Sequence, residues 1–136
     1  YRALVLSNLV AIHQKTGIGR LSAYCGAVSA GAAAGAGIAY LCGGGYEEVI
    51  HTVVNALAIV SGMVCDGAKA SCAAKIASSV DAGILGYNMY LRGQQFYAGD
   101  GIVTKGVEAT IQNIGRLGKD GMKETNEEII KMMISD

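Results

Sequence analysis

A stretch of 22 residues without a single charge, from Leu21 to Cys42, constrains the fold of this chain more than any other feature. It is dominated by alanine and glycine and contains the spacing Gly31-x-x-x-Gly35, which lets two helices approach closely. A membrane-spanning helix and a helix buried among neighbouring helices both accommodate such a stretch. Alanine and glycine gain little from transfer into lipid, and the flanks lack an aromatic belt with a basic cluster. The composition therefore favours a buried helix over a membrane span.

The rest of the chain also favours helices. No proline occurs among the 136 residues, and the long segments are rich in alanine, leucine, isoleucine and methionine. We therefore predict an all-α fold, a compact bundle of about six helices around the buried Ala/Gly-rich central helix. The helical ranges that we expect are 2–14, 21–42, 47–61, 66–91, 104–117 and 125–133.

Polar residues at the predicted helix starts suggest how these helices begin. Asp66 and Thr104 are expected to cap the helices that follow them, and Thr125-x-x-Glu128 has the pattern of a capping box. We expect the fourth helix to continue to residue 91, and a bend or split at the glycines at 83 and 86 is the alternative. The range 92–101 contains three glycines among polar groups and is expected to be an irregular loop.

Charge and composition narrow the class of protein. Eleven basic residues balance eleven acidic ones, and seven tyrosines and one phenylalanine are the only aromatic residues, so we expect no nucleic-acid partner. The absence of a secretory signal and the large apolar fraction favour reduced thiols and a cytoplasmic location. We expect residues 1–136 to form a single helical domain, the carboxy-terminal fragment of a longer protein, because the chain opens inside an apolar run.

Two cysteines next to glycines form the candidate site. A thiolate that binds iron needs room for a cluster and backbone N–H groups directed at its sulfur, and Cys25-Gly26 and Cys65-Asp66-Gly67 can provide both. Cys72 follows Cys65 by seven residues, which would be about two turns on one face of a helix that starts at Asp66. No C-x-x-C pair occurs, so the usual zinc and ferredoxin spacings are absent. Buried thiols that merely pack are the alternative.

Four sequence blocks resemble one enzyme family. They are Ile-Gly-Arg-Leu-Ser-Ala-Tyr-Cys-Gly-Ala at 18–27, Ser-Gly-Met-Val-Cys-Asp-Gly-Ala-Lys at 61–69, Gly-Asp-Gly-Ile-Val at 99–103 and Asn-Ile-Gly-Arg-Leu-Gly at 113–118. In this order they resemble the carboxy-terminal part of the L-cysteine desulfidase family, which is related to the alpha chain of iron–sulfur L-serine dehydratases. The likeness extends from about residue 8 to about residue 133.

The resemblance implies a lyase that depends on a [4Fe–4S] cluster and not on pyridoxal phosphate. Such an enzyme converts L-cysteine to pyruvate, ammonia and sulfide, or L-serine to pyruvate and ammonia. The implied site consists of Cys25 and Cys65 as metal ligands, Cys72 as a substitute candidate, and Gly26, Asp66 and Gly67 beside the cluster. A third cysteine would come from a Gly-Cys-Thr-Glu-Pro segment in the missing N-terminal region. The cluster is therefore expected to be absent or incomplete in this fragment, and the fragment alone is expected to be inactive.

The implied chemistry also needs groups that the cysteines do not supply. Three thiolates leave one iron open, and an open iron is a Lewis acid that can stabilise the departing thiolate or hydroxide. A base must remove the Cα proton, and the candidates are Lys69 and Asp100. The simpler interpretation makes Asp66 a helix cap, Lys69 and Lys75 solvated tips, and Asp100 part of a turn.

The expected partners follow from this interpretation. They are a small amino-acid substrate, the missing N-terminal region and, in a homo-oligomer, further copies of the protein. No membrane partner is expected. The alternative function is a non-enzymatic helical interaction module in which the free thiols only pack.

Overall fold

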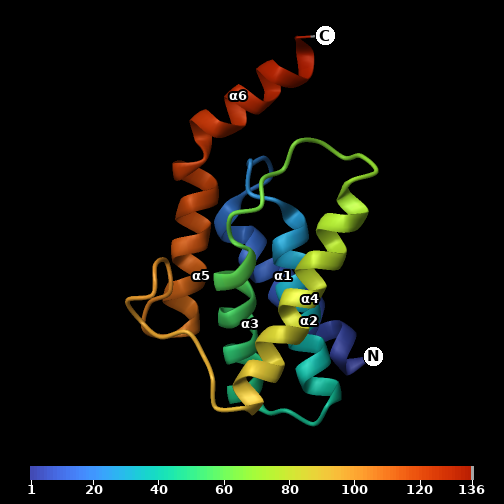
Figure 1. Cartoon of the computed structure of the whole chain (residues 1–136), viewed down its shortest axis with the longest axis vertical. Helices are drawn as coiled ribbons and strands as arrows, with labels where there is room; N and C mark the ends of the chain where they lie inside the picture. The colour runs from blue at the N-terminus through green and yellow to red at the C-terminus, as the bar shows by residue number, and fades with distance from the viewer. Residues whose placement is uncertain (136) are drawn as a thin grey trace.

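Six α-helices and one π-helical turn account for most of residues 1–135, the part of the chain that the computed structural model describes (Figure 1). In chain order they are α1 (Arg2–Ile18), α2 (Gly26–Leu41), α3 (Tyr46–Val60), α4 (Cys72–Leu91), α5 (Val107–Arg116), the π-helical turn (Leu117–Gly121) and α6 (Lys123–Ile134). Within these residues the only β-type pairing is an isolated antiparallel bridge between Tyr24 and Val64. The predicted all-α fold is confirmed.

Helix α2 lies at the centre of the bundle, because α1, α3 and α4 all pack against it. Most of its residues are buried, among them Val28, Ser29, Gly31, Ala32, Ala33, Gly35, Ala36, Gly37 and Ala39. The prediction of a buried central Ala/Gly helix is therefore confirmed. Among the helices of residues 1–135, none combines the length and the apolar character that crossing a bilayer requires.

The packing of α2 against α4 depends on glycines. A Cβ atom on Gly31 would lie 2.3 Å from the carbonyl carbon of Ser79, and a Cβ atom on Gly83 would lie 2.7 Å from the carbonyl oxygen of Gly31. Gly86 has the same role toward α3, because a Cβ atom there would lie 2.9 Å from Cβ of Asn55. The predicted continuation of this helix to Leu91 is confirmed, and the glycines at 83 and 86 do not split it, since α4 runs from Cys72 to Leu91.

Helix α1 ends later than predicted. It continues past Gln14 to Ile18, because Gly17 fits inside the helix, where it faces Gly115 of α5. A Cβ atom on Gly17 would lie 3.5 Å from the Cα atom of Gly115. The next residue, Gly19, stops the helix with a φ of 92°, a left-handed backbone conformation that favours glycine.

Two predicted helix caps in the second half of the chain are wrong. Helix α5 begins at Val107, after Gly106 rather than Thr104, and the Thr104 amide instead donates to the hydroxyl of Thr110 at 3.2 Å. Helix α6 begins at Lys123, so Thr125 lies inside it and does not cap it. The predicted irregular loop is confirmed and is longer than expected, because it extends from the end of α4 to the start of α5.

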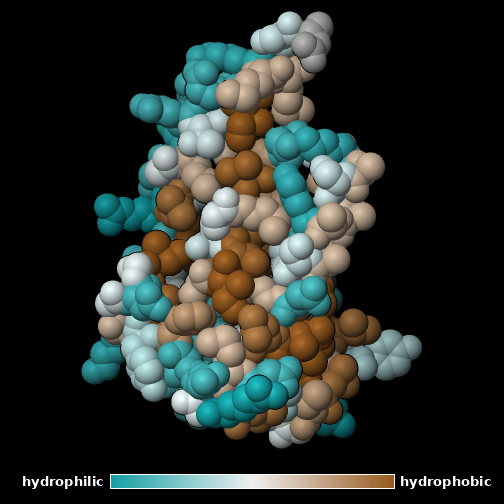
Figure 2. Space-filling model, in the orientation of Figure 1, coloured by the Kyte–Doolittle hydropathy of each residue, from teal (hydrophilic) through white to brown (hydrophobic). Residues whose placement is uncertain are grey.

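One side of α1 is apolar and exposed. Its residues Leu4, Val5, Leu9 and Ile12 are each more than half exposed, and Figure 2 shows apolar side chains gathered around the N-terminal end of the chain. The opposite side of α1 packs on α2 and α5. The described residues therefore leave an apolar face of α1 uncovered.

The close approach of α2 and α4 makes Gly31 sensitive to substitution. Gly31→Ala forces a methyl group into the backbone of α4, so the free energy of unfolding should fall by about 1–3 kcal/mol, the usual cost of overpacking. Gly26→Ala in the same helix is the matched control, because a Cβ atom there meets nothing within 4 Å. Urea unfolding of the metal-free chain measures both variants. Equal stability of the two variants would contradict the described packing.

Candidate functional site

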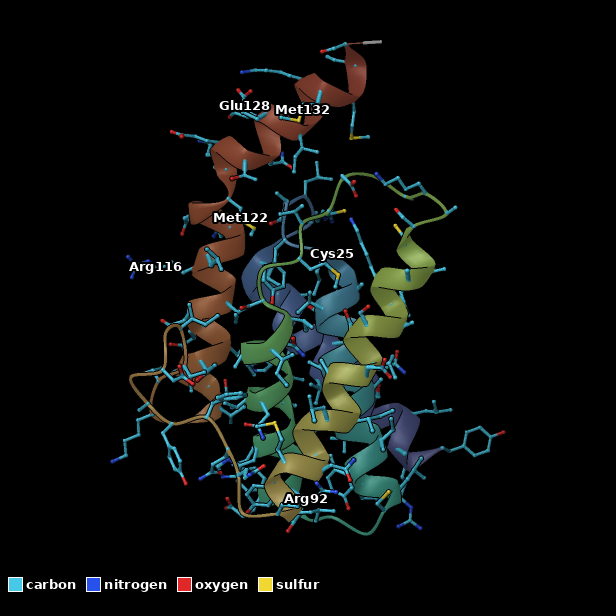
Figure 3. All side chains as sticks on the ribbon, in the orientation of Figure 1. Cys25, Arg92, Arg116, Met122, Glu128 and Met132 are labelled. Carbon is cyan, nitrogen blue, oxygen red and sulfur yellow. The ribbon has the colours of Figure 1, made fainter. Side chains whose placement is uncertain are left out.

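Cys25 and Cys65 lie at diagonal positions across one short antiparallel bridge, although 40 positions separate them in the sequence. The Cys25 amide donates to the carbonyl of Met63 at 3.1 Å, and the Cys65 amide donates to the carbonyl of Ala23 at 2.7 Å. Figure 3 shows Cys25 at one end of the bundle, beside the connection between α3 and α4, and Arg92 at the other end. The structure therefore brings the two predicted metal ligands together at one end of α2.

The segment before α2 is extended, although it was predicted to be helical from Leu21. The hydroxyl of Ser22 accepts a hydrogen bond from the Tyr24 amide at 2.9 Å and donates to the Gly118 carbonyl at 2.5 Å. Such local side-chain bonds compete with helix formation. Helix α2 therefore begins at Gly26, and Cys25 is its N-cap residue rather than part of its first turn. A negative charge on Cys25 would face the positive end of the helix dipole.

Tyr24 anchors this extended segment in the core. Its side chain is almost fully buried, and its hydroxyl has no hydrogen-bond partner among residues 1–135. Burial, with a smaller effect of neighbouring Cys25, raises the pKa of Tyr24. Gly118 provides the space for this packing, because a Cβ atom there would lie 3.1 Å from Cβ of Tyr24. The role of Tyr24 is not predicted from the sequence, where its one signal is a single aromatic residue in a run of small residues.

Asp66 does not cap α4, contrary to the prediction. The helix begins at Cys72, and the Asp66 carboxylate instead accepts hydrogen bonds from Lys69 and Lys75. These bonds lower the pKa of Asp66 to about 2, and the bond from Lys69 has the larger effect. Because α4 does not start at Asp66, the expectation that Cys65 and Cys72 share a helix face is also wrong.

Lys75 was interpreted as a solvated tip, and this interpretation is wrong. Its side chain is only 21% exposed, and its ammonium group donates to Asp66 Oδ1 at 2.5 Å and to the Val64 carbonyl at 2.8 Å. Asp66 raises the pKa of Lys75 most, and Cys25 and Cys72 raise it further. Cys72 lies three residues before Lys75 in the first turn of α4, and the ammonium group of Lys75 contacts the residues on both sides of Cys65.

The remaining residues predicted to lie at this site surround the same thiols. The Cys72 thiol donates to the Gly67 carbonyl at 3.4 Å. Gly67 has a φ of 93°, and a Cβ atom there would lie 2.8 Å from Cε of Met133, so α6 also approaches this end of the bundle. At Gly26 a Cβ atom would meet nothing within 4 Å. Space is therefore open beside Cys25.

Of the two candidate bases, the structure places one near the thiols. Lys69 donates to Asp66 and is about half exposed. Asp100 lies in the loop between α4 and α5, where its amide donates to the carbonyl of Tyr97 at 3.1 Å. Figure 1 shows this loop beside the N-terminal end of α5, whereas the α3–α4 connection lies near the C-terminal end of α5. The structure does not bring Asp100 to the thiols.

The four cysteines are free thiols with different surroundings. Cys25 is buried and Cys65 and Cys72 are half-buried, while Cys42 is exposed at the C-terminal end of α2, away from the others. In the described part of the chain, no three His, Cys, Asp or Glu side chains gather closely enough to hold a single metal ion. The cysteines of a four-iron cluster each bind a different iron, so their sulfurs stand further apart than the ligands of one ion.

Comparison with known proteins identifies the family. The family model of the serine dehydratase alpha chain matches residues 1–131. The chain belongs to the serine dehydratase alpha chain family. The resemblance predicted from the sequence blocks is confirmed, and the matched region contains Cys25, Cys65 and Cys72 together with Lys75.

Curated relatives of this serine dehydratase alpha chain member include several UPF0597 proteins. That of Desulfitobacterium hafniense is 70% identical over 99% of this chain and 31% of its own length. Those of Lachnoclostridium phytofermentans and Treponema denticola are 59% and 55% identical, over 98% and 99% of this chain and 32% and 31% of their own lengths. The chain therefore spans about a third of the length of these relatives. No solved structure matches it.

The ion pairs of Asp66 predict a pH-dependent contribution to stability. The pKa of Asp66 is lower in the folded chain than its ordinary value of 3.8, so this contribution is present above about pH 4 and is lost as the pH falls toward 2.

An NMR titration of the side-chain carboxyl carbon of Asp66 should give a midpoint near pH 2. Lys69→Met and Lys75→Met should each raise that midpoint because each removes a hydrogen bond to the carboxylate. Lys105→Met, in the loop between α4 and α5 that lies beside the N-terminal end of α5, should not. A midpoint near 3.8 in the unsubstituted chain would contradict this geometry.

Proposed function

We propose that this chain is the cluster-binding part of a lyase that eliminates a β-substituent from a small amino acid. The substrate is L-cysteine, which gives pyruvate, ammonia and sulfide, or L-serine, which gives pyruvate and ammonia. The observation that carries the proposal is the antiparallel pairing of Tyr24 with Val64, which puts Cys25 and Cys65 at diagonal positions of one bridge in a member of the serine dehydratase alpha chain family.

The chemistry of the donor set supports an iron–sulfur cluster. Thiolates are soft ligands that suit iron–sulfur centres. Cys25, Cys65 and Cys72 are the thiols that would hold the cluster, and the open space at Gly26 leaves room beside them. When bound, a [4Fe–4S] cluster with one iron that lacks a protein ligand supplies a Lewis acid for the departing thiolate or hydroxide. Cys72 is the third ligand that this chain itself offers, and a cysteine from elsewhere in a longer protein is the other source.

The protein residues around the thiols would have separate roles. The ammonium group of Lys75 offsets the negative charge that thiolates and Asp66 bring together. The buried ring of Tyr24 and the apolar residues that pack around it exclude water from the protein side of the site. Lys69 is the base candidate that lies at the thiol end, and in this role it would have to leave Asp66 and give up its own proton before its amine nitrogen could accept the Cα proton.

Cysteine substitutions in the full-length protein test this proposal. After anaerobic reconstitution the protein should be brown, contain iron and acid-labile sulfide, and form pyruvate from L-cysteine or L-serine. Cys25→Ser and Cys65→Ser should lose the iron and the activity, because each removes a ligand. Cys42→Ser is the matched control and should keep both, since Cys42 lies at the other end of α2. Cys72→Ser shows whether the third ligand belongs to this chain.

The alternative, thiols that only pack, gives a different result in the same experiment. Cys25→Ser and Cys65→Ser would then change the free energy of unfolding by about 1–3 kcal/mol or less and leave the iron content unchanged. Iron and pyruvate formation that survive both substitutions would overturn the proposed function.

A further inference from the structure

We propose that Lys75 is a positioning residue that ties Cys65 to Cys72 before any cluster is bound. The naming of the two cysteines as ligands rests on the proposed function. The tie itself is a property of the metal-free chain. Lys75 does not need to touch substrate for this role, because it acts through the segment that carries Cys65.

The two acceptors of Lys75 lie on either side of Cys65. One is the carbonyl oxygen of Val64 at 2.8 Å, and the other is the carboxylate of Asp66 at 2.5 Å. An ammonium group that bonds to the residues before and after a cysteine restricts the backbone of that cysteine. Lys75 therefore holds the Cys65 segment at two points.

The same lysine belongs to the first turn of α4. It lies three residues after Cys72, and residues three apart are neighbours on the surface of a helix. The side chain of Lys75 therefore joins the helix end that carries Cys72 to the non-helical segment that carries Cys65. This connection does not depend on the chain between them, because the residues from 66 to 71 form no regular helix.

The opposite side of the Cys65 segment is held by a different contact. The Cys65 amide donates to the carbonyl of Ala23, which fixes the segment against the residues before α2. Cys25 is thus joined to Cys65 by the backbone bridge, and Cys65 is joined to Cys72 by Lys75. Loss of Lys75 should release Cys72 from the other two cysteines and let the Cys65 segment, with its bridge amide, open more often.

Lys69 is a natural control for this proposal. It also bonds to Asp66, but it belongs to the same irregular segment as Asp66 and is 48% exposed. Its ammonium group has no bond to the Val64 carbonyl and its side chain does not come from α4. Lys69 therefore cannot tie α4 to Cys65, although it carries the same charge at the same end of the bundle.

The first measurement uses metal-free full-length protein. Lys75→Met keeps the length of the side chain and removes its donors, so hydrogen exchange of the peptide that covers residues 61–71 should become about tenfold faster or more. Lys75→Arg keeps a charged donor and should restore slow exchange, and Lys69→Met should exchange like the unsubstituted protein. Exchange of the α2 peptide shows whether the bundle remains folded. If the α2 peptide also exchanges faster in Lys75→Met, that variant has unfolded the bundle, and Lys75→Gln is then measured in its place.

The second measurement follows iron loss from the reconstituted protein under a chelator. Lys75→Met should lose iron several-fold faster than Lys75→Arg and Lys69→Met, because a ligand that moves freely dissociates more readily. The role of Lys75 would be overturned if residues 61–71 exchanged at the unsubstituted rate in Lys75→Met or Lys75→Gln. It would also be overturned if Lys69→Met sped up exchange as much as Lys75→Met does. Iron that remains in Cys25→Ser and Cys65→Ser would instead overturn the proposed function, and the exchange measurement would still decide the role of Lys75.

Discussion

Two backbone hydrogen bonds, on either side of the Tyr24–Val64 pair, are the contact on which the candidate site depends. A single hydrogen bond contributes only about 1 kcal/mol to stability, so an isolated bridge needs support from its surroundings. The buried ring of Tyr24 and the bond from Ser22 to the Gly118 carbonyl support the first segment. Lys75 supports the second segment through the Val64 carbonyl. The bridge is therefore held in place from both sides.

The glycine contact between α2 and α4 determines where the remaining groups lie. Because Gly31 and Gly83 let the two backbones approach, α4 runs alongside α2 and its first turn reaches the end of the bundle where α2 begins. Cys72 and Lys75 lie in that first turn, and Cys25 lies at the start of α2. The small residues of α2, which favour a buried helix over a membrane span, thus have a positioning role in this bundle.

The sequence predicted the helical class and the buried central helix well, because composition alone decides both. The proximity of Cys25 and Cys65 was anticipated from the family resemblance and not from spacing, since a bridge between distant segments leaves no periodic signal. The predicted cap at Asp66 failed because two ammonium groups are stronger partners for a carboxylate than helix N–H groups. The role of Lys75 was missed because its partners lie across an irregular segment, which leaves no periodic pattern in the sequence. The role of Asp100 as a base remains a prediction, and its position away from the thiols gives that role no support.

The most direct test is whether the two cysteine segments are paired before any cluster is bound. In an antiparallel pair of this type the Cα atoms approach to about 4.5 Å, so the Hα protons of Tyr24 and Val64 should give a strong nuclear Overhauser cross-peak in the metal-free chain. The account predicts that cross-peak, together with slow exchange of the Cys25 and Cys65 amides. Assigned Hα resonances without a cross-peak, and amides that exchange as in an unfolded peptide, would contradict it.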